Sequence, residues 1–246
     1  MKFSLFFSTL VMVLFSTSSS FAQTNIVERG FACSINDGYS MRDVVEVARN
    51  FEWSEDAAPG VVIFRSAVAV AGEFQNDWDF VFASYYPSYA DMVEKRGVFL
   101  NRSGGRTGVS LSDVATCGDR VRISNMQFAT PIEGGSPPEF SLAASWICEL
   151  NGATFADALS MASGGEQALG ARAAVTRRAF GGPPIQNNSQ VEIRMTFPSA
   201  ADFGAGFDAI QQGTPPANAI TCSGGSMWAL SLIHISEPTR RYAIAY

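Results

Sequence analysis

Apolar and polar residues alternate along several segments of the chain with a period of two, which is typical of β-strands. The clearest example separates an apolar face from a polar one: Val191, Ile193, Met195 and Phe197 against Glu192, Arg194 and Thr196. Alternation, or a high content of β-branched and aromatic residues, predicts eight strands, over 30–36, 61–70, 78–86, 120–128, 142–150, 171–180, 190–197 and 220–229. The apolar face of 191–197 is expected to meet helices.

A hydroxyl residue followed three positions later by aspartate predicts the start of a helix. The hydroxyl caps the first free backbone N–H groups, and the acid suits the positive end of the helix dipole. Four such pairs lie between the predicted strands: Ser40 and Asp43, Ser88 and Asp91, Thr154 and Asp157, Ser199 and Asp202. Pro87 and Pro198 directly precede two of the caps and are expected to end the strands before them.

The two halves of the chain repeat each other in the same order. Four segments recur with small drifts in spacing: Phe31–Asn36 as Trp146–Asn151, Asp43–Ala48 as Asp157–Ala162, Tyr86–Asp91 as Phe197–Asp202, and Thr116-Cys117 as Thr221-Cys222. Each half then has the order β-α-β-β-α-β, which is ferredoxin-like. We expect one unit over 23–129 and a second over 141–229, joined by a Gly- and Pro-rich linker over 130–140.

Each unit carries one cysteine near its start and one near its end. Of the three ways to pair four cysteines, the repeat favours the two equivalent bonds Cys33–Cys117 and Cys148–Cys222. In the ferredoxin-like order the first and fourth strands are antiparallel neighbours, and this arrangement suits the same pairing. A metal site is disfavoured, because the spacing lacks a C-x-x-C pair.

Duplication and strand order together resemble the dimeric α/β-barrel superfamily, in which two ferredoxin-like units pack sheet against sheet. The resemblance implies an α+β fold of two tandem βαββαβ units packed as a pseudo-dimeric α/β barrel. The superfamily includes small monooxygenases, isomerases, haem proteins of the chlorite dismutase kind, and stress-response proteins. No catalytic motif of any of these families is present, so the resemblance assigns no site residue.

Both ends of the chain are expected to lie outside the two units. Residues 1–22 have a lysine, an apolar run and a small-x-small cleavage pattern, as in a secretory signal peptide, so the protein is expected to be exported to the periplasm or secreted. Leu230–Arg240 matches the translation of a sequencing-library adapter residue for residue, and 230–246 is therefore interpreted as an artefactual tail. The single histidine, His234, lies in this tail, which leaves the rest of the sequence without an imidazole for catalysis or haem ligation.

Charge excludes some partners. The formal net charge is −6, and the leader and tail together contribute two positive charges, so the remainder is more acidic still. An acidic chain without a basic cluster is not expected to bind nucleic acid or anionic membrane surfaces, and no lipid anchor is predicted. No cofactor and no metal are expected. A small-molecule ligand is possible, and the oligomeric state is left open.

Four side chains form the candidate ligand site. Strand alternation puts Glu192 and Arg194 on the face opposite the helices, the repeat aligns Tyr85 with that face, and Glu149 lies on it in its own strand. Acids beside an arginine in a half-apolar cavity can bind a small polar ligand, or one acid can act as a base if its pKa is raised. The alternative interpretation is a solvated sheet face with ordinary cross-strand ion pairs.

Asn36 and Asn151 recur at equivalent positions just after the first strand of each unit. A turn asparagine that bonds to its own backbone is the simplest explanation for both, and a ligand contact is the alternative.

Three functions fit these observations. The first is an exported small-molecule-binding or stress-related protein. The second is a cofactor-independent oxygenase or isomerase that uses a cavity carboxylate. The third is a structural or interaction module with a filled interior and no ligand. A wet, charged cavity favours the first two, and a carboxylate with a raised pKa favours the second.

Overall fold

The protein is described by a computed structural model that covers residues 25–70, 78–101, 110–131, 138–181, 189–212 and 219–235. Eight strands close into an antiparallel barrel in the order β3-β2-β9-β6-β8-β7-β5-β1, with β1 pairing back to β3. They are β1 (Asn25–Ile35), β2 (Val61–Ala69), β3 (Phe80–Tyr86), β5 (Arg122–Phe128), β6 (Phe140–Glu149), β7 (Arg172–Phe180), β8 (Gln190–Phe197) and β9 (Thr221–Ile235). The short β4 (Ala115–Cys117) pairs with the end of β1.

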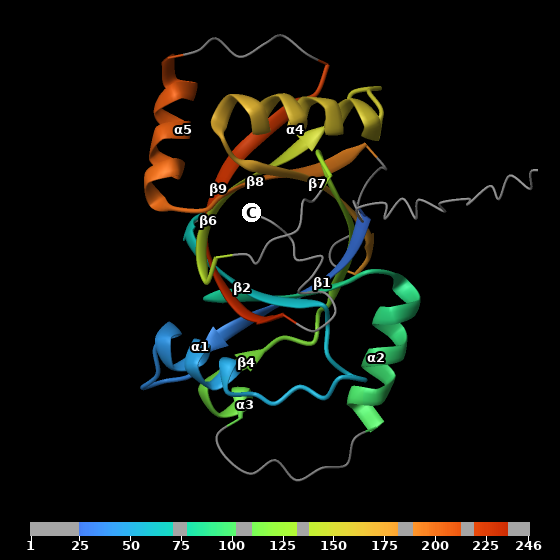
Figure 1. Cartoon of the computed structure of the whole chain (residues 1–246), viewed down its shortest axis with the longest axis vertical. Helices are drawn as coiled ribbons and strands as arrows, with labels where there is room; N and C mark the ends of the chain where they lie inside the picture. The colour runs from blue at the N-terminus through green and yellow to red at the C-terminus, as the bar shows by residue number, and fades with distance from the viewer. Residues whose placement is uncertain are drawn as a thin grey trace, which may run out of the picture.

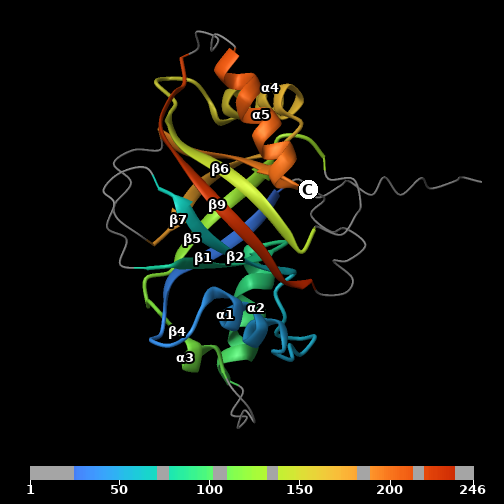
Figure 2. The same cartoon turned by 90° about the vertical axis from the view of Figure 1, so that its left-hand side faces the viewer.

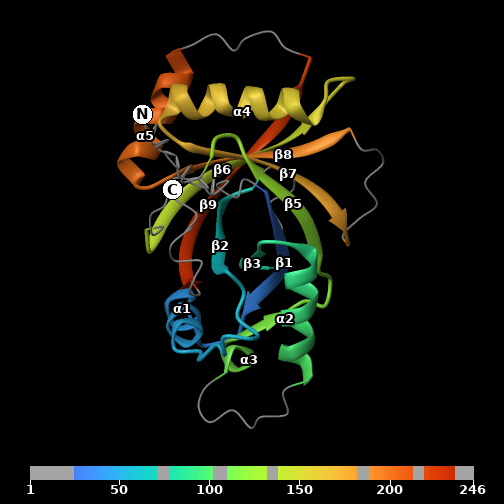
Figure 3. The same ribbon diagram turned by 45° about the vertical axis from the view of Figure 1, so that its right-hand side comes forward.

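Helices cover the outside of the barrel. Figure 1 shows the strands as a closed ring with helices on two opposite sides of it. On one side lie α4 (Phe155–Leu169) and α5 (Ala200–Gln212), and on the other lie α1 (Met41–Arg49), α2 (Tyr89–Asn101) and α3 (Leu111–Val114). In Figure 3, α4 lies across the top of the barrel, where it packs on β7 and β8. The mixed α+β barrel predicted from the sequence is therefore confirmed.

The sheet is continuous, so the two expected units do not stand as separate sheets that face each other. β2 pairs with β9 and β5 pairs with β7, and these pairings join the first half of the chain to the second. Closing the ring pairs the long edge strands of the two halves, because these strands satisfy each other's backbone N–H and C=O groups, and among the described strands the short β4 remains at an edge. Figure 2 shows β6 and β9 crossing the front of the barrel side by side.

Most predicted strands agree with the structure within two residues, and the first and last differ more. β1 begins at Asn25, five residues before the predicted start, and so brings Glu28 into the barrel. β9 runs on to Ile235, and residues 230–235 of the predicted tail pair with β2. Their origin in an adapter stays a prediction. The predicted signal peptide and residues 236–246 lie outside the described residues.

The helix caps form as the sequence predicts. The Ser40 backbone N–H donates to Asp43 Oδ2 at 2.7 Å, and the Thr154 backbone N–H donates to Asp157 Oδ2 at the same distance. A fifth pair of this kind, Ser110 with Asp113, starts α3 and was not predicted. Of the described residues, no helix has the length and hydropathy needed to cross a membrane.

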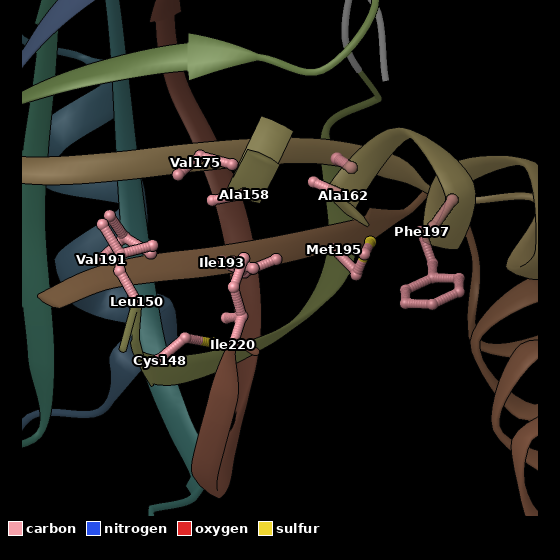
Figure 4. Packing of buried hydrophobic residues seen from close by; sticks show 12 residues of the cluster. Cys148, Leu150, Ala158, Ala162, Val175, Val191, Ile193, Met195, Phe197 and Ile220 are labelled. Carbon is pink, nitrogen blue, oxygen red and sulfur yellow. The ribbon is translucent and has the colours of Figure 1, made fainter. Parts of the chain in front are cut away.

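The outer face of the barrel forms dry cores with the helices. Val191, Ile193 and Met195 of β8 point toward Ala158 and Ala162 of α4, as Figure 4 shows. All of these side chains are buried. The prediction that the apolar face of this strand meets helices is confirmed, and its polar face consequently points into the barrel.

Both predicted disulfides are present. Cys33 is bonded to Cys117 across β1 and β4, and Cys148 to Cys222 across β6 and β9. The first cysteine of each pair lies in the core, at 1% exposure or less. Two disulfide bonds indicate a protein from outside the cytoplasm, because the cytoplasm keeps thiols reduced.

Candidate functional site

A buried ion network occupies the inside of the barrel. Glu28 on β1 lies between two arginines: Arg65 Nη2 of β2 is 2.8 Å from Glu28 Oε1, and Arg194 Nη1 of β8 is 2.9 Å from Oε2. Arg194 Nη2 lies 3.2 Å from Glu192 Oε1 on the same strand. The side chains of Glu28 and Arg194 are 7% and 5% exposed. Charged groups from three strands therefore meet where the surrounding protein excludes most water.

The charges in this network fix its protonation states. Burial by itself raises the pKa of Glu28, but the charges of Arg194 and Arg65, and hydrogen bonds from Arg194 and Tyr85, outweigh it and lower the pKa to about 2. Burial and the charge of Glu28 raise the pKa of Tyr85 to about 12. For Arg194, burial lowers the pKa, but Glu28 and Glu192 outweigh that effect and raise it well above its usual value. At neutral pH Glu28 is an anion and Tyr85 a neutral phenol.

Three of the four predicted site residues meet inside the barrel. Arg194 Nη1 lies 3.5 Å from the Tyr85 hydroxyl, and Glu192 is paired to Arg194. Glu149 does not join them, because it lies at the end of β6, where it accepts hydrogen bonds from Ser189 and Gln190. On β6 the partner of Arg194 is Ser145, so Glu149 lies four residues, or about 13 Å, farther along the strand. Alternation predicted its face correctly but not its position along the barrel.

Glu28 and Arg65 are the two members of the network that the sequence analysis missed. Glu28 was missed because the first strand was expected to begin at Gly30. Arg65 lies in the predicted strand 61–70, but its equivalent in the second half of the chain, Thr176, is uncharged, so the repeat gave no sign of it. Extending the first strand toward the N-terminus places Ile26 and Glu28 on the inner face, and this was the available signal.

A small cavity of about 20 Å³ lies beside the network. Its lining has five residues with hydrogen-bond donors and four apolar residues: Arg65, Arg172, Arg194, Tyr85 and Thr196, with Met126, Phe128, Ala174 and Leu230. Arg172 also donates from Nη1 to Glu166 at 3.0 Å and from Nη2 to the Pro131 carbonyl at 2.6 Å. The size matches about one water molecule, so the lumen is largely filled by protein.

A larger hollow of about 560 Å³ lies on the outer surface beside the start of α4. Asp157 is the ionisable residue among those described in its lining, and it is already bonded to Thr154 as part of the helix cap. The interior cavity is the smaller of the two, but it is the one where reactive and charged groups converge.

The repeated asparagines do not bond to their own turns, contrary to the simplest expectation. Asn36 Nδ2 donates to the Asp113 carbonyl at 3.1 Å and its Oδ1 accepts from Thr116 at 2.8 Å. Asn151 Nδ2 donates to the Ala219 carbonyl at 2.8 Å and to Thr221 at 3.0 Å. Each asparagine therefore ties the end of its strand to the segment that carries the second cysteine. The threonine of each repeated Thr-Cys pair takes part in these contacts, and we call each set of contacts an asparagine clamp.

Metal ligation has no visible basis in the described ranges, where no three His, Cys, Asp or Glu side chains gather as a metal site.

Among known proteins, this chain is similar only to solved structures. No family model matches the chain, and no curated protein sequence matches it. A protein proposed to be a chlorite dismutase, TA0507, has 12% sequence identity to this chain and a TM-score of 0.47. The match covers 86% of this chain and 96% of the TA0507 chain. A proposed monooxygenase of Fusobacterium nucleatum has 10% sequence identity and a TM-score of 0.40. The match covers 87% of this chain and 94% of the Fusobacterium chain. The chlorite dismutase of Candidatus Nitrospira defluvii in complex with imidazole has 11% identity and a TM-score of 0.40, with 82% and 90% covered.

Proposed function

We propose that this chain is an exported binding protein whose site for a small polar ligand is the inside of the barrel around Arg194. The observation that carries the proposal is the lining of the interior cavity, where three guanidinium groups and two hydroxyl groups converge on one space. A half-apolar cavity with a few fixed polar groups is the usual form of a small-ligand site. Tyr85, Glu192 and Arg194 remain in the proposed site, and Glu149 is left out.

The ion network supports binding better than acid–base catalysis. A general base at neutral pH needs a pKa near that pH, but the pKa of Glu28 is lowered to about 2 and that of Tyr85 is raised to about 12. Glu28 is also held by two arginines and is not free to approach a substrate. The oxygenase or isomerase alternative therefore has less support than the binding function.

The interaction-module alternative is favoured by one observation, the size of the interior cavity. A space of about 20 Å³ excludes organic ligands of ordinary size unless the barrel rearranges. The two functions differ in whether the three arginines recruit a ligand or only hold the barrel together.

The proposed architecture is a duplicated ferredoxin-like unit. Its support is that the strands of the first half stand in the order β5-β1-β3-β2 and those of the second half in the order β9-β6-β8-β7. Within each half the fourth long strand in sequence therefore lies beside the first, which is the ferredoxin-like arrangement. The equivalent disulfides and asparagine clamps of the two halves give further support.

The test has two readouts on the chain secreted with its own leader. Native mass spectrometry detects a molecule that co-purifies, and thermal unfolding is followed in sodium bromide, nitrate, formate and acetate at matched ionic strength. We expect either a retained mass or a rise in Tm with one of these salts. Thr196→Val removes one hydroxyl group from the cavity lining and should reduce the effect, whereas Glu139→Gln, on an exposed side chain, should not.

A bare mass together with the same Tm in all four salts would overturn the binding function and favour the interaction module. A salt effect of equal size in Thr196→Val and the unmodified protein would place the ligand outside the lumen.

A further inference from the structure

The interior cavity has a lining that donates hydrogen bonds and carries no acid. Of the nine described residues around it, three are arginines and two have hydroxyl groups, while none is aspartate or glutamate. The carboxylates that neutralise the arginines are Glu28, Glu166 and Glu192, and all three are absent from this lining. Each arginine is thus held by carboxylates elsewhere while part of it borders the cavity.

Each of the three guanidinium groups also has a donor to spare. The Nε–H groups of Arg65, Arg172 and Arg194 are buried and have no hydrogen-bond acceptor among the residues that the structure describes. The Arg194 side chain is 5% exposed, so bulk water does not supply that acceptor. A buried donor is rarely left unpaired, and the three residues with these donors all line the same cavity, which points to an acceptor inside it.

The size and chemistry of the cavity restrict what that acceptor is. About 20 Å³ admits one water molecule or one monoatomic ion, and excludes phosphate, sulfate and carboxylic acids. Water has two hydrogens of its own to donate, and in this lining the hydroxyl oxygens and the Met126 sulfur are the acceptors it would find. A halide ion only accepts hydrogen bonds and therefore matches the three Nε–H groups and the Thr196 hydroxyl, whereas the Tyr85 hydroxyl already donates to Glu28.

We propose that the cavity between Arg65, Arg172 and Arg194 binds a single halide ion. This inference rests on the proposed function and names the class of its ligand. Because three carboxylates already balance the three arginines, the ion is held by directed donors and not by excess positive charge. The ion would contact residues of β2, in the first half of the chain, and of β7 and β8, in the second.

The test uses bromide as the halide, because its anomalous scattering identifies it in a crystal. Crystals of the secreted chain grown without halide and then transferred to sodium bromide should give one anomalous peak between the three arginines. In solution, the folding equilibrium constant should rise about tenfold for each tenfold rise in bromide above the dissociation constant, relative to sodium gluconate at the same ionic strength.

A pair of conservative variants tests the donors. Arg65→Lys can keep the ion pair with Glu28 but lacks the Nε–H group, so the bromide dependence should weaken while the protein stays folded. Arg49→Lys makes the same change on a more exposed arginine outside the barrel and should keep the full dependence.

Three results would overturn the halide inference. The first is a water without anomalous signal in the cavity, found together with a bare mass in native mass spectrometry and no effect of any salt on Tm. This result would overturn the proposed function as well. The second is a larger retained molecule, or a rise in Tm with formate or nitrate but not with bromide. This result would support the proposed binding function and contradict the halide as its ligand. A peak in the cavity without any bromide dependence of folding would mean an adventitious ion only.

Discussion

Glu28 and Arg194 are 166 residues apart in the chain, yet the Arg194 guanidinium donates to the Glu28 carboxylate at 2.9 Å inside the barrel. Their strands, β1 and β8, are not neighbours in the sheet, so the contact crosses the lumen. It joins the first half of the chain to the second at the centre of the fold. The ion network therefore contributes to holding the barrel closed as well as to its proposed site.

Replacing Glu28 tests how much the network contributes to stability. Glu28→Gln removes the charge that compensates Arg65 and Arg194, and loss of one partner of a buried pair costs about 3–5 kcal/mol. Urea unfolding should show this loss. Glu139→Gln is the matched control, because Glu139 is 85% exposed in its pair with Arg49 and should change the free energy of unfolding by less than about 1 kcal/mol. Equal effects of the two substitutions would contradict the structural role of the network.

The lowered pKa of Glu28 predicts a loss of stability in acid. A carboxyl group whose folded pKa is depressed stabilises the protein above its unfolded pKa, and the contribution disappears as the pH falls through the folded value. For Glu28 this window runs from about 4.5 down to about 2, and the contribution is roughly 3 kcal/mol.

The difference in unfolding free energy between the unmodified protein and Glu28→Gln should therefore be constant above about pH 5 and shrink toward pH 2. Hydrogen bonds from the backbone N–H and hydroxyl groups of the capping residues also lower the pKa of Asp43, Asp113 and Asp157, but these groups are common to both proteins and cancel in the difference. A difference that does not change with pH would show that Glu28 is not ionised through its ion pairs.

The two disulfides are expected to stabilise the fold by similar amounts. They close loops of 84 and 74 positions, for which chain entropy gives about 4 kcal/mol each. The double variants Cys33→Ala with Cys117→Ala, and Cys148→Ala with Cys222→Ala, should each lower Tm, and reduction of the unmodified protein should lower it further. Peptide mapping of the oxidised protein provides the control, since any crossed cysteine pair would contradict the structure.

Two glycines in α5 predict opposite effects of the same substitution. A Cβ at Gly204 has no atom within 4 Å, so Gly204→Ala should stabilise the protein by up to about 1 kcal/mol through helix propensity. A Cβ at Gly206 would lie 2.8 Å from Phe197 Cε1 and 3.2 Å from the Leu169 carbonyl oxygen. Phe197 is fully buried and cannot move aside, so Gly206→Ala should destabilise by roughly 1–3 kcal/mol. Thermal unfolding of the two variants decides this, and a rise in Tm for Gly206→Ala would show that α5 does not pack closely on β8.

Part of the candidate site followed from alternation along single strands. Arg194 and Glu192 were placed on the inner face because a strand turns successive side chains to opposite sides. Glu149 satisfies the same rule but lies too far along the barrel to reach them, since its partner on β8 is Gln190. Alternation fixes the face of a residue, whereas its height in the barrel depends on the register between strands.

By itself the sequence determined eight strands, four helices, their order and the cysteine pairs, because caps, alternation and the internal repeat are local or recurring signals, but it missed α3 and β4. Tertiary structure decided which charges meet. Glu28, Arg65 and Arg194 come from strands far apart in the chain, and closure of the barrel sets their register. Closure also decided that residues 230–235 belong to the barrel, because β2 needs a partner along its length. Neither result can be derived from local patterns, since both depend on how strands distant in sequence satisfy each other's backbone groups and buried charges.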